Sequence, residues 1–223
     1  MHPVQATVVA SQPKDPISPS QAAPQVIVKA SKLDSNRQDL LQDIRDEIGQ
    51  CTRCKLHTGR KNIVFGEGAP YARLMFIGEG PGADEDIQGR PFVGRAGKLL
   101  TSLINKMGFE RQAVYIANIV KCRPPGNRDP EEDEMKGCIG FLEKQIAVIN
   151  PEIIVTLGSV STRILLKTDK RISDLRGHFH EYRGIKVMPT FHPSYLLRNS
   201  SQKWTTWNDA LMVLKELGLQ PLE

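Results

Sequence analysis

The sequence lacks long apolar runs and is poor in aromatic residues, which make up only 6% of its 223 positions. No stretch approaches the ~20 consecutive apolar residues that cross a membrane. The first residues also lack the basic segment and apolar core of a secretory signal. We therefore expect a protein of the reducing cytoplasm that is not associated with a membrane.

Glycine and aromatic residues are absent from residues 1–35, which carry five of the fifteen prolines among Ser, Gln and Ala. Without a sustained apolar period this composition predicts a flexible tail. Residues 36–223 are expected to form one domain, because their number suits a single core. The net charge of +5 is compatible with a polyanionic partner such as nucleic acid, although charge alone is weak evidence.

Cysteine is scarce, and the four that occur are expected to be metal ligands or free thiols in a reducing compartment. Cys51 and Cys54 form a C-x-x-C pair, and Cys122 and Cys138 follow singly. Four thiolates suit either a structural zinc ion or an iron–sulfur cluster, and one pair plus two distant cysteines favours the cluster. The alternative is a redox C-x-x-C with two buried bystanders, which is weaker because no thioredoxin-like pattern accompanies CTRC.

Expected strands and helices alternate along the rest of the chain, which predicts an α/β fold with a mostly parallel sheet covered on both faces. Ligands of such sheets bind outside the carboxyl ends of the strands. A hairpin-like turn at Arg183-Gly184 precedes the last expected strand, and His178 and His180 alternate on a further possible strand without an assigned role. Strands are expected at 73–77, 113–120, 152–158 and 185–191, and helices at 36–48, 96–107, 131–149, 159–166 and near the C-terminus.

A glycine-rich turn, GEGPGADED from Gly78, follows the first expected strand and matches neither the P-loop nor the G-x-G-x-x-G pattern. The acids Glu79, Asp84, Glu85 and Asp86 would repel a phosphate. We therefore expect a neutral heterocycle or carbonyl as the ligand, with a carboxylate that accepts from or positions a water molecule. Asp86 is expected to face water, whereas Glu79 is expected to be buried.

Three further residues could contact a base. Phe92 lies in an Arg- and Gly-rich loop, where it either stacks on a base or packs as a satellite core residue. Asn118 ends the second expected strand, where its amide either reads a pyrimidine edge or bonds to loop backbone. His192 follows the last expected strand, and a lone histidine there is more often structural than catalytic.

The segment HPSYLLR ends in residues that could meet DNA. Ser194 can contact a phosphate, and Tyr195, Leu196 and Leu197 are expected at an exposed loop tip. Apolar tips of this kind can be pushed into a base stack as a wedge.

Taken together, GEGPGADED, GRPFVGRAG, the loop from Asn118 to Pro125, HPS and the four-cysteine spacing resemble the family 4 uracil-DNA glycosylases of bacteria and archaea. The resemblance covers about residues 37–218. It implies the uracil-DNA glycosylase superfold, a three-layer α/β/α sandwich around a four-stranded parallel sheet. It also implies a structural [4Fe–4S] cluster held by Cys51, Cys54, Cys122 and Cys138.

The resemblance implies a role for each matched position. Gly78, Glu79 and Gly80 would lie against a flipped uracil and its attacking water, and Glu85 would sit beside the base. Phe92 would stack on the ring, Asn118 would read O4 and N3–H, and His192 would donate to O2. The implied catalytic residues are Glu79, Glu85 and His192, and the implied wedge and phosphate contacts are Ser194, Tyr195, Leu196, Leu197 and Arg198.

The implied activity is hydrolysis of the N-glycosidic bond of deoxyuridine in single- or double-stranded DNA, which releases uracil and starts base excision repair. No lysine in these motifs suits Schiff-base formation, so we expect a monofunctional enzyme without lyase activity. A monomer, associated with the prokaryotic nucleoid during repair, is expected. The alternative is a non-catalytic Cys-metal module that recognises damaged or structured DNA.

Overall fold

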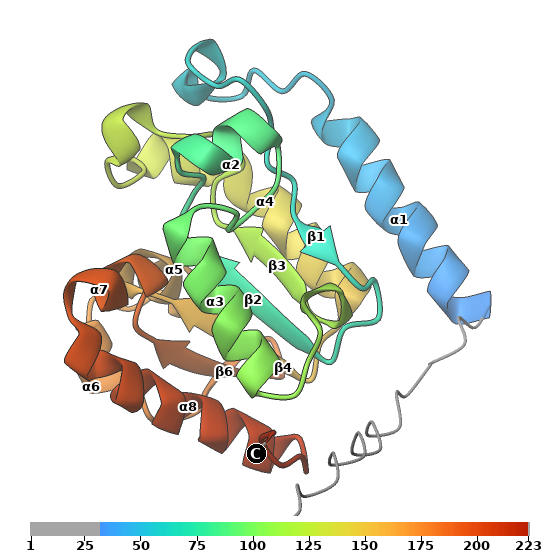
Figure 1. Cartoon of the computed structure of the whole chain (residues 1–223). Helices are drawn as coiled ribbons and strands as arrows, with labels where there is room; N and C mark the ends of the chain where they lie inside the picture. Colours follow the sequence, from blue (N-terminus) through green and yellow to red (C-terminus); the bar gives the residue numbers. More distant parts are fainter. Residues whose placement is uncertain (1–31, 223) are drawn as a thin grey trace, which may run out of the picture. The chain divides into compact units, whose positions relative to one another are not determined.

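A mixed six-stranded sheet with the order β1-β3-β2-β4-β6-β5 organises the chain (Figure 1). The computed structural model describes the backbone of residues 32–222, so most of the predicted tail lies outside the described residues. The strands are β1 (Glu67–Gly68), β2 (Leu74–Gly78), β3 (Tyr115–Asn118), β4 (Ile153–Leu157), β5 (His180–Tyr182) and β6 (Ile185–Thr190).

The four central strands, β3, β2, β4 and β6, run parallel, whereas β1 and β5 pair antiparallel at the two edges. The predicted sheet of four parallel strands is therefore wrong in its strand count. The prediction missed β1 altogether, because two residues carry no alternating pattern. The β5–β6 hairpin turns at Arg183 and Gly184, as the sequence predicted.

Eight α-helices connect or flank these strands in residues 32–222. The first begins at Lys32, four residues before the predicted start, and the helix predicted at 159–166 has those bounds. The helices are α1 (Lys32–Ile48), α2 (Ala83–Gln88), α3 (Arg95–Lys106), α4 (Glu132–Ile149), α5 (Ser159–Leu166), α6 (Ile172–Leu175), α7 (Pro193–Arg198) and α8 (Lys203–Glu216). Short 3-10 turns lie at η1 (Lys55–Thr58), η2 (Arg111–Ala113), η3 (Pro125–Asn127) and η4 (Ser200–Gln202).

Alternating residues of the central strands fill two apolar cores, one on each face of the sheet. In β2, Met75 and Ile77 join the core under α1, α4 and α5, whereas Leu74 and Phe76 join the core under α3 and α8. This alternation follows from the two-residue period of a strand. Burial of each large apolar side chain contributes about 1.5–3 kcal/mol, so both helical layers are held by the same strands. The prediction of an α/β fold with helices on both faces is confirmed.

The strand order places a crossing point beside β2. The chain passes from β2 to β3 on one side and later returns to β4 on the other side. Crevices at such points, outside the carboxyl ends of the strands, are the usual ligand sites of α/β sheets. No helix of residues 32–222 is long and apolar enough to cross a membrane.

Candidate functional site

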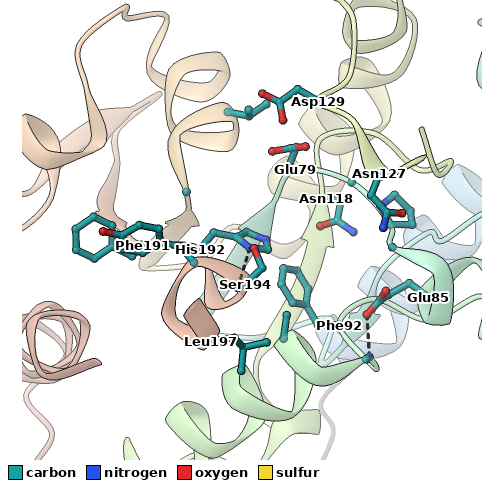
Figure 2. Close-up of a pocket in the computed structure, with 18 of the residues that line it drawn as sticks. Glu79, Glu85, Phe92, Asn118, Asn127, Asp129, Phe191, His192, Ser194 and Leu197 are labelled. Carbon is teal, nitrogen blue, oxygen red and sulfur yellow. Dashed lines mark hydrogen bonds between the residues drawn. The ribbon is translucent and has the colours of Figure 1, made fainter. Parts of the chain in front are cut away.

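A cavity of about 1050 Å³ opens at the carboxyl ends of β2, β3, β4 and β6. Figure 2 shows Phe92, Asn118 and His192 around one space, with the carboxylates of Glu79 and Asp129 at its far side. Most of the residues predicted from sequence line this cavity together: Glu79, Gly80, Glu85, Phe92, Asn118, His192, Ser194, Tyr195, Leu197 and Arg198.

The absent side chain of Gly78 makes room for two of these residues. A Cβ atom at Gly78 would lie 2.4 Å from Oδ1 of Asn118 and 2.6 Å from Cζ of Phe92. Gly78 also pairs with Asn118 across the parallel strands. The glycine at the end of β2 therefore lets the aromatic ring and the amide converge at the floor of the cavity.

Phe92 is held in a strained backbone conformation. Its φ of +50° is rare for a bulky residue, and its ring is buried with a centroid 5.7 Å from that of the His192 ring. Oε1 of Glu85 accepts hydrogen bonds from the backbone N–H groups of Val93 and Gly94, both at 2.9 Å. These bonds fix the loop on the C-terminal side of Phe92. A carboxylate predicted to sit beside the base therefore has bonds that position the aromatic residue.

Arg111 fixes the same loop from the other side. One of its guanidinium nitrogens donates to the carbonyl of Pro91 at 2.6 Å, and Glu67 accepts from Arg111 at 2.7 Å. A strained backbone conformation such as that of Phe92 persists only when contacts on both sides hold it in place. Nothing in the local sequence around Arg111 pointed to this contact, because the partners lie 20 and 44 residues away.

Asn118 has an unused acceptor. Its residue is 1% exposed, and Oδ1 has no hydrogen-bond partner among the described residues. A buried polar atom without a partner costs about 1–3 kcal/mol, so native proteins rarely keep one that no ligand or water satisfies. The atom calls for a donor from within the cavity.

His192 is a neutral donor in this arrangement. Its Nδ1 accepts from the backbone N–H of Ser194 at 3.1 Å, and the Ser194 hydroxyl lies 2.7 Å from the same nitrogen. Burial, and then the positive charge of Arg198, lowers the pKa of His192 to about 4. Because Nδ1 is the acceptor, the single ring proton of the neutral form is on Nε2, where it can be donated to a ligand.

Glu79 retains its proton unusually well for a carboxylic acid. Burial, and then the negative charge of Asp129, raises the pKa of Glu79 to about 7. Asp129 is exposed and lies on the loop between η3 and α4. Local sequence patterns do not reveal Asp129, because it lies 50 positions after Glu79 in the chain. A carboxyl group with a raised pKa, beside a second carboxylate, can accept from and orient a water molecule.

The segment after His192 is a short helix, α7, and not a loop tip. Tyr195 and Leu197 are 36% and 44% exposed, whereas Leu196 is only 4% exposed. The expectation that all three apolar residues are exposed is therefore wrong for Leu196. Helical geometry turns neighbouring side chains to different faces, and Leu196 faces the core.

The expectation that Asp86 faces water is also wrong. Asp86 is 2% exposed, and its Oδ1 accepts from the backbone N–H groups of Lys61 and Asn62 at 2.8 and 3.3 Å. The Asn62 side chain returns a hydrogen bond to the carbonyl of Asp86 at 2.8 Å. Asp86 thus joins α2 to the segment that follows the C-x-x-C pair.

The four cysteines gather where the end of α1, the segment after β3 and helix α4 meet. Burial raises the pKa of Cys122, the Arg60 guanidinium opposes that rise, and the neighbouring Cys54 and Cys51 add to it. Burial likewise raises the pKa of Cys138 to about 11. Within residues 32–222, no group of three or more His, Cys, Asp or Glu side chains is placed to hold a metal ion.

Two donors point at cysteine sulfur atoms. Arg60 donates to Sγ of Cys122 at 3.4 Å, and the backbone N–H of Lys121 donates to Sγ of Cys138 at 3.2 Å. Hydrogen bonds of this kind favour the thiolate that a metal requires. Arg60 follows the C-x-x-C pair by only six residues, but nothing in the sequence distinguishes it from the other basic residues nearby.

Comparison with known proteins gives a consistent result. The model of the uracil DNA glycosylase superfamily matches residues 65–212. A type-4 uracil-DNA glycosylase of Thermotoga maritima is 48% identical over 169 residues, which cover 75% of this chain and 88% of the relative. One from Saccharolobus solfataricus is 47% identical over 193 residues, covering 82% and 89%. A type-5 uracil-DNA glycosylase of Pyrobaculum aerophilum is 31% identical over 148 residues, covering 59% and 65%.

Proposed function

The chain belongs to the uracil DNA glycosylase superfamily and acts as a hydrolase that excises uracil from DNA, and on this premise we propose how its pocket works. A base stacked in a duplex cannot reach the cavity. The target nucleotide must therefore be flipped out of the helix, at a cost of a few kcal/mol. The flipped uracil would stack on Phe92 and present its pairing edge to Asn118.

The unpartnered Oδ1 of Asn118 is the observation that carries this proposal. Uracil has an N3–H donor at the middle of its pairing edge, whereas cytosine has an acceptor there. Uracil would satisfy Oδ1, and cytosine would leave two acceptors facing each other. The side-chain amide of Asn118 would donate to O4 at the same time.

Bond cleavage leaves negative charge on the uracil ring. The Nε2–H of His192 would donate to O2, where that charge gathers. A donor preset in this way is typically worth about 2.7–4 kcal/mol in the transition state. Glu79, with Asp129 beside it, would hold the water that attacks the sugar. The carboxyl group of Glu85 would act on the base through the position of Phe92.

On the DNA side, Tyr195 and Leu197 are the exposed apolar residues of α7 that could enter the base stack, whereas burial keeps Leu196 from this role. Arg198 and Ser194 would contact phosphates, and such contacts weaken as the salt concentration rises. No lysine occurs among the described residues that line the pocket, which supports a monofunctional reaction without a Schiff base.

We further propose that Cys51, Cys54, Cys122 and Cys138 hold a [4Fe–4S] cluster. Four thiols with two N–H donors aimed at sulfur are a donor set that suits iron–sulfur ligation. A cluster of four irons is wider than one ion, so its ligands need not converge as closely as those of zinc. When bound, the group would cross-link the end of α1, the segment after β3 and helix α4.

We propose a monomer that works beside the nucleoid in the cytoplasm, with residues 36–223 as its catalytic domain. A non-catalytic DNA-binding module is not favoured, because the three relatives described above are glycosylases by name.

The deciding experiment incubates the purified holoprotein with labelled oligonucleotides that contain one uracil, either single-stranded or paired with G or A. Alkaline treatment should then cleave the strand at the uracil position. A matched cytosine oligonucleotide should stay intact, and borohydride should trap no protein–DNA adduct. Intact uracil strands would contradict the proposed activity, and a trapped adduct would contradict the monofunctional reaction.

A further inference from the structure

Lys121 is a lysine with 0% exposure that lies between the pocket and the cysteines. Its ammonium group donates to two neutral oxygens, the carbonyl of Asn118 at 3.0 Å and Oε1 of Gln145 at 2.6 Å. No ion pair of the described residues includes it. A buried ammonium without a carboxylate is costly to fold around. Its presence therefore calls for a reason beyond packing.

The two partners of Lys121 belong to elements with different tasks. Asn118 ends β3 and reaches the pocket, whereas Gln145 belongs to α4, the helix that also carries Cys138. The side-chain amide of Gln145 donates in turn to the carbonyl of Phe65 at 3.0 Å, which fixes the orientation of its oxygen. The Lys121 side chain thus connects the strand end to the cysteine-bearing helix.

The backbone of segment 118–122 also makes hydrogen bonds to both the pocket and the cysteine site. The N–H of Val120 donates to the carbonyl of Glu79 at 3.0 Å, and the N–H of Lys121 donates to Sγ of Cys138 at 3.2 Å. These five residues therefore connect the pocket floor to the cysteine site, and hydrogen bonds fix their backbone at both ends. A thiolate at Cys138 would bring a negative charge close to this segment.

We propose that Lys121 is a positioning residue for Asn118, which it ties through the Asn118 carbonyl to α4 and to the cysteine site. This proposal rests on the proposed role of Asn118 in reading uracil. Lys121 does not line the pocket and does not touch the substrate. Its loss should free the Asn118 carbonyl, let the end of β3 shift, and move Oδ1 away from the position that meets N3–H.

The test is a double-mutant cycle that combines Lys121→Met with Asn118→Ala in the iron-loaded protein. Lys121→Met should lower single-turnover uracil excision by about tenfold in the natural background and by less than about twofold when Asn118 is already Ala. Binding to an uncleavable 2′-fluoro-deoxyuridine oligonucleotide should lose preference over undamaged DNA to a matching degree. Iron content and visible absorbance, measured for every variant, should stay at the natural level.

Ile146→Ala is the matched control, because Ile146 follows Gln145 in α4, is buried like Lys121 with 3% exposure, and is not bonded to Asn118. It should lower stability and reduce excision by the same factor in both backgrounds. Equal factors for Lys121→Met in both backgrounds, with iron retained, would overturn the proposal.

Gln145→Leu provides a second route if Lys121→Met does not fold, because it removes a partner of the ammonium group from a different element. It should show the same coupling with Asn118→Ala. If neither variant yields folded, iron-loaded protein, the contact serves the scaffold and the proposal fails. Absence of uracil excision by the natural protein would instead refute the proposed function, so the two failures are distinguishable.

Discussion

Single side chains in the pocket are fixed by the protein on one side and left open on the other. Nδ1 of His192 accepts a hydrogen bond from the backbone N–H of Ser194, which leaves Nε2–H free to donate to a ligand. Asn118 is buried by its neighbours and keeps Oδ1. In the proposed mechanism, this division would let the donors and acceptors meet the base without rearranging, which is the condition for strong electrostatic stabilisation.

Replacement of His192 by Ala should slow uracil release by about 10²–10³-fold, because one preset donor to the leaving base is lost. Affinity for uracil-containing DNA should change little, since the donor acts mainly on charge that develops during cleavage. Single-turnover rates and equilibrium binding measure the two effects. Ser194→Ala is the control: it retains the backbone N–H to Nδ1 and should have a much smaller effect. Equal rates for His192→Ala and the natural protein would remove His192 from the mechanism.

Replacement of Glu79 by Gln should stabilise the fold at high pH and reduce excision. The pKa of Glu79 is about 7 in the folded state and near 4.5 when unfolded. The folded state therefore binds more protons in that interval, and stability falls as pH rises from 4.5 to 7. Denaturant unfolding should show the advantage of Glu79→Gln growing across this interval and then levelling off above pH 7.

Glu132→Gln serves as the control for that experiment. Glu132 is an exposed residue of α4 whose pKa is lowered by its hydrogen bond and ion pair with Lys136. It should give no gain in stability at any pH. An equal gain in stability for both variants, or no gain for Glu79→Gln, would show that the ionised carboxylate of Glu79 does not destabilise the fold.

Sequence alone was informative where a residue type has one obvious use and failed where the partner is distant. Phe92, Asn118 and His192 were predicted as candidates and line one cavity. Asp86 was expected in water because a run of acids is usually solvated. The two backbone N–H groups that bury it come from a segment 24–25 residues earlier, which no local pattern reveals.

At the level of elements, the loop that carries Phe92 and the helix α3 that follows it form one unit. The start of α3 lies directly under the loop, because a Cβ atom on Gly97 would stand only 1.9 Å from the carbonyl oxygen of Phe92. Glu85 and Arg111 hold the loop from either flank. The loop therefore has a single position, set by a glycine inside a helix.

Gly97→Ala should push the Phe92 loop off the helix, with a loss of about 1–3 kcal/mol from overpacking and a marked fall in excision. Gly140→Ala is the matched control, because Gly140 lies in α4 with nothing within 4 Å of the added Cβ. That variant should gain about 0.5–1 kcal/mol with unchanged activity. Thermal unfolding and initial rates distinguish the two, and equal behaviour would contradict the steric argument.

Elements with a long apolar period were predictable, and short ones were not. The helix at 159–166 and the central strands follow from periodicity, because their apolar faces must be buried. α2, α6 and α7 have four to six residues and β1 has two, too few for a period to emerge. Their positions depend on tertiary hydrogen bonds such as those of Asp86.

For the whole molecule, the proposed cluster is the cross-link between segments far apart in sequence. Purified protein should be brown, with broad absorbance near about 400 nm. Cys138→Ser should lower both iron content and melting temperature, because Cys138 lies in α4 and its loss opens the cross-link to the N-terminal segment. A colourless, zinc-loaded protein with full activity would refute the cluster.

The two short edge strands, β1 and β5, affect how readily the enzyme aggregates at high protein concentration. Each antiparallel border offers only two or three residues of backbone to a newcomer. In β1, a Cβ atom on Gly68 would lie 1.8 Å from the carbonyl oxygen of Val114. The backbones of β1 and β3 are therefore too close together at this position for any residue other than glycine. A strand from another molecule therefore has few backbone groups to pair with at either edge, and aggregation by strand addition to this sheet is disfavoured.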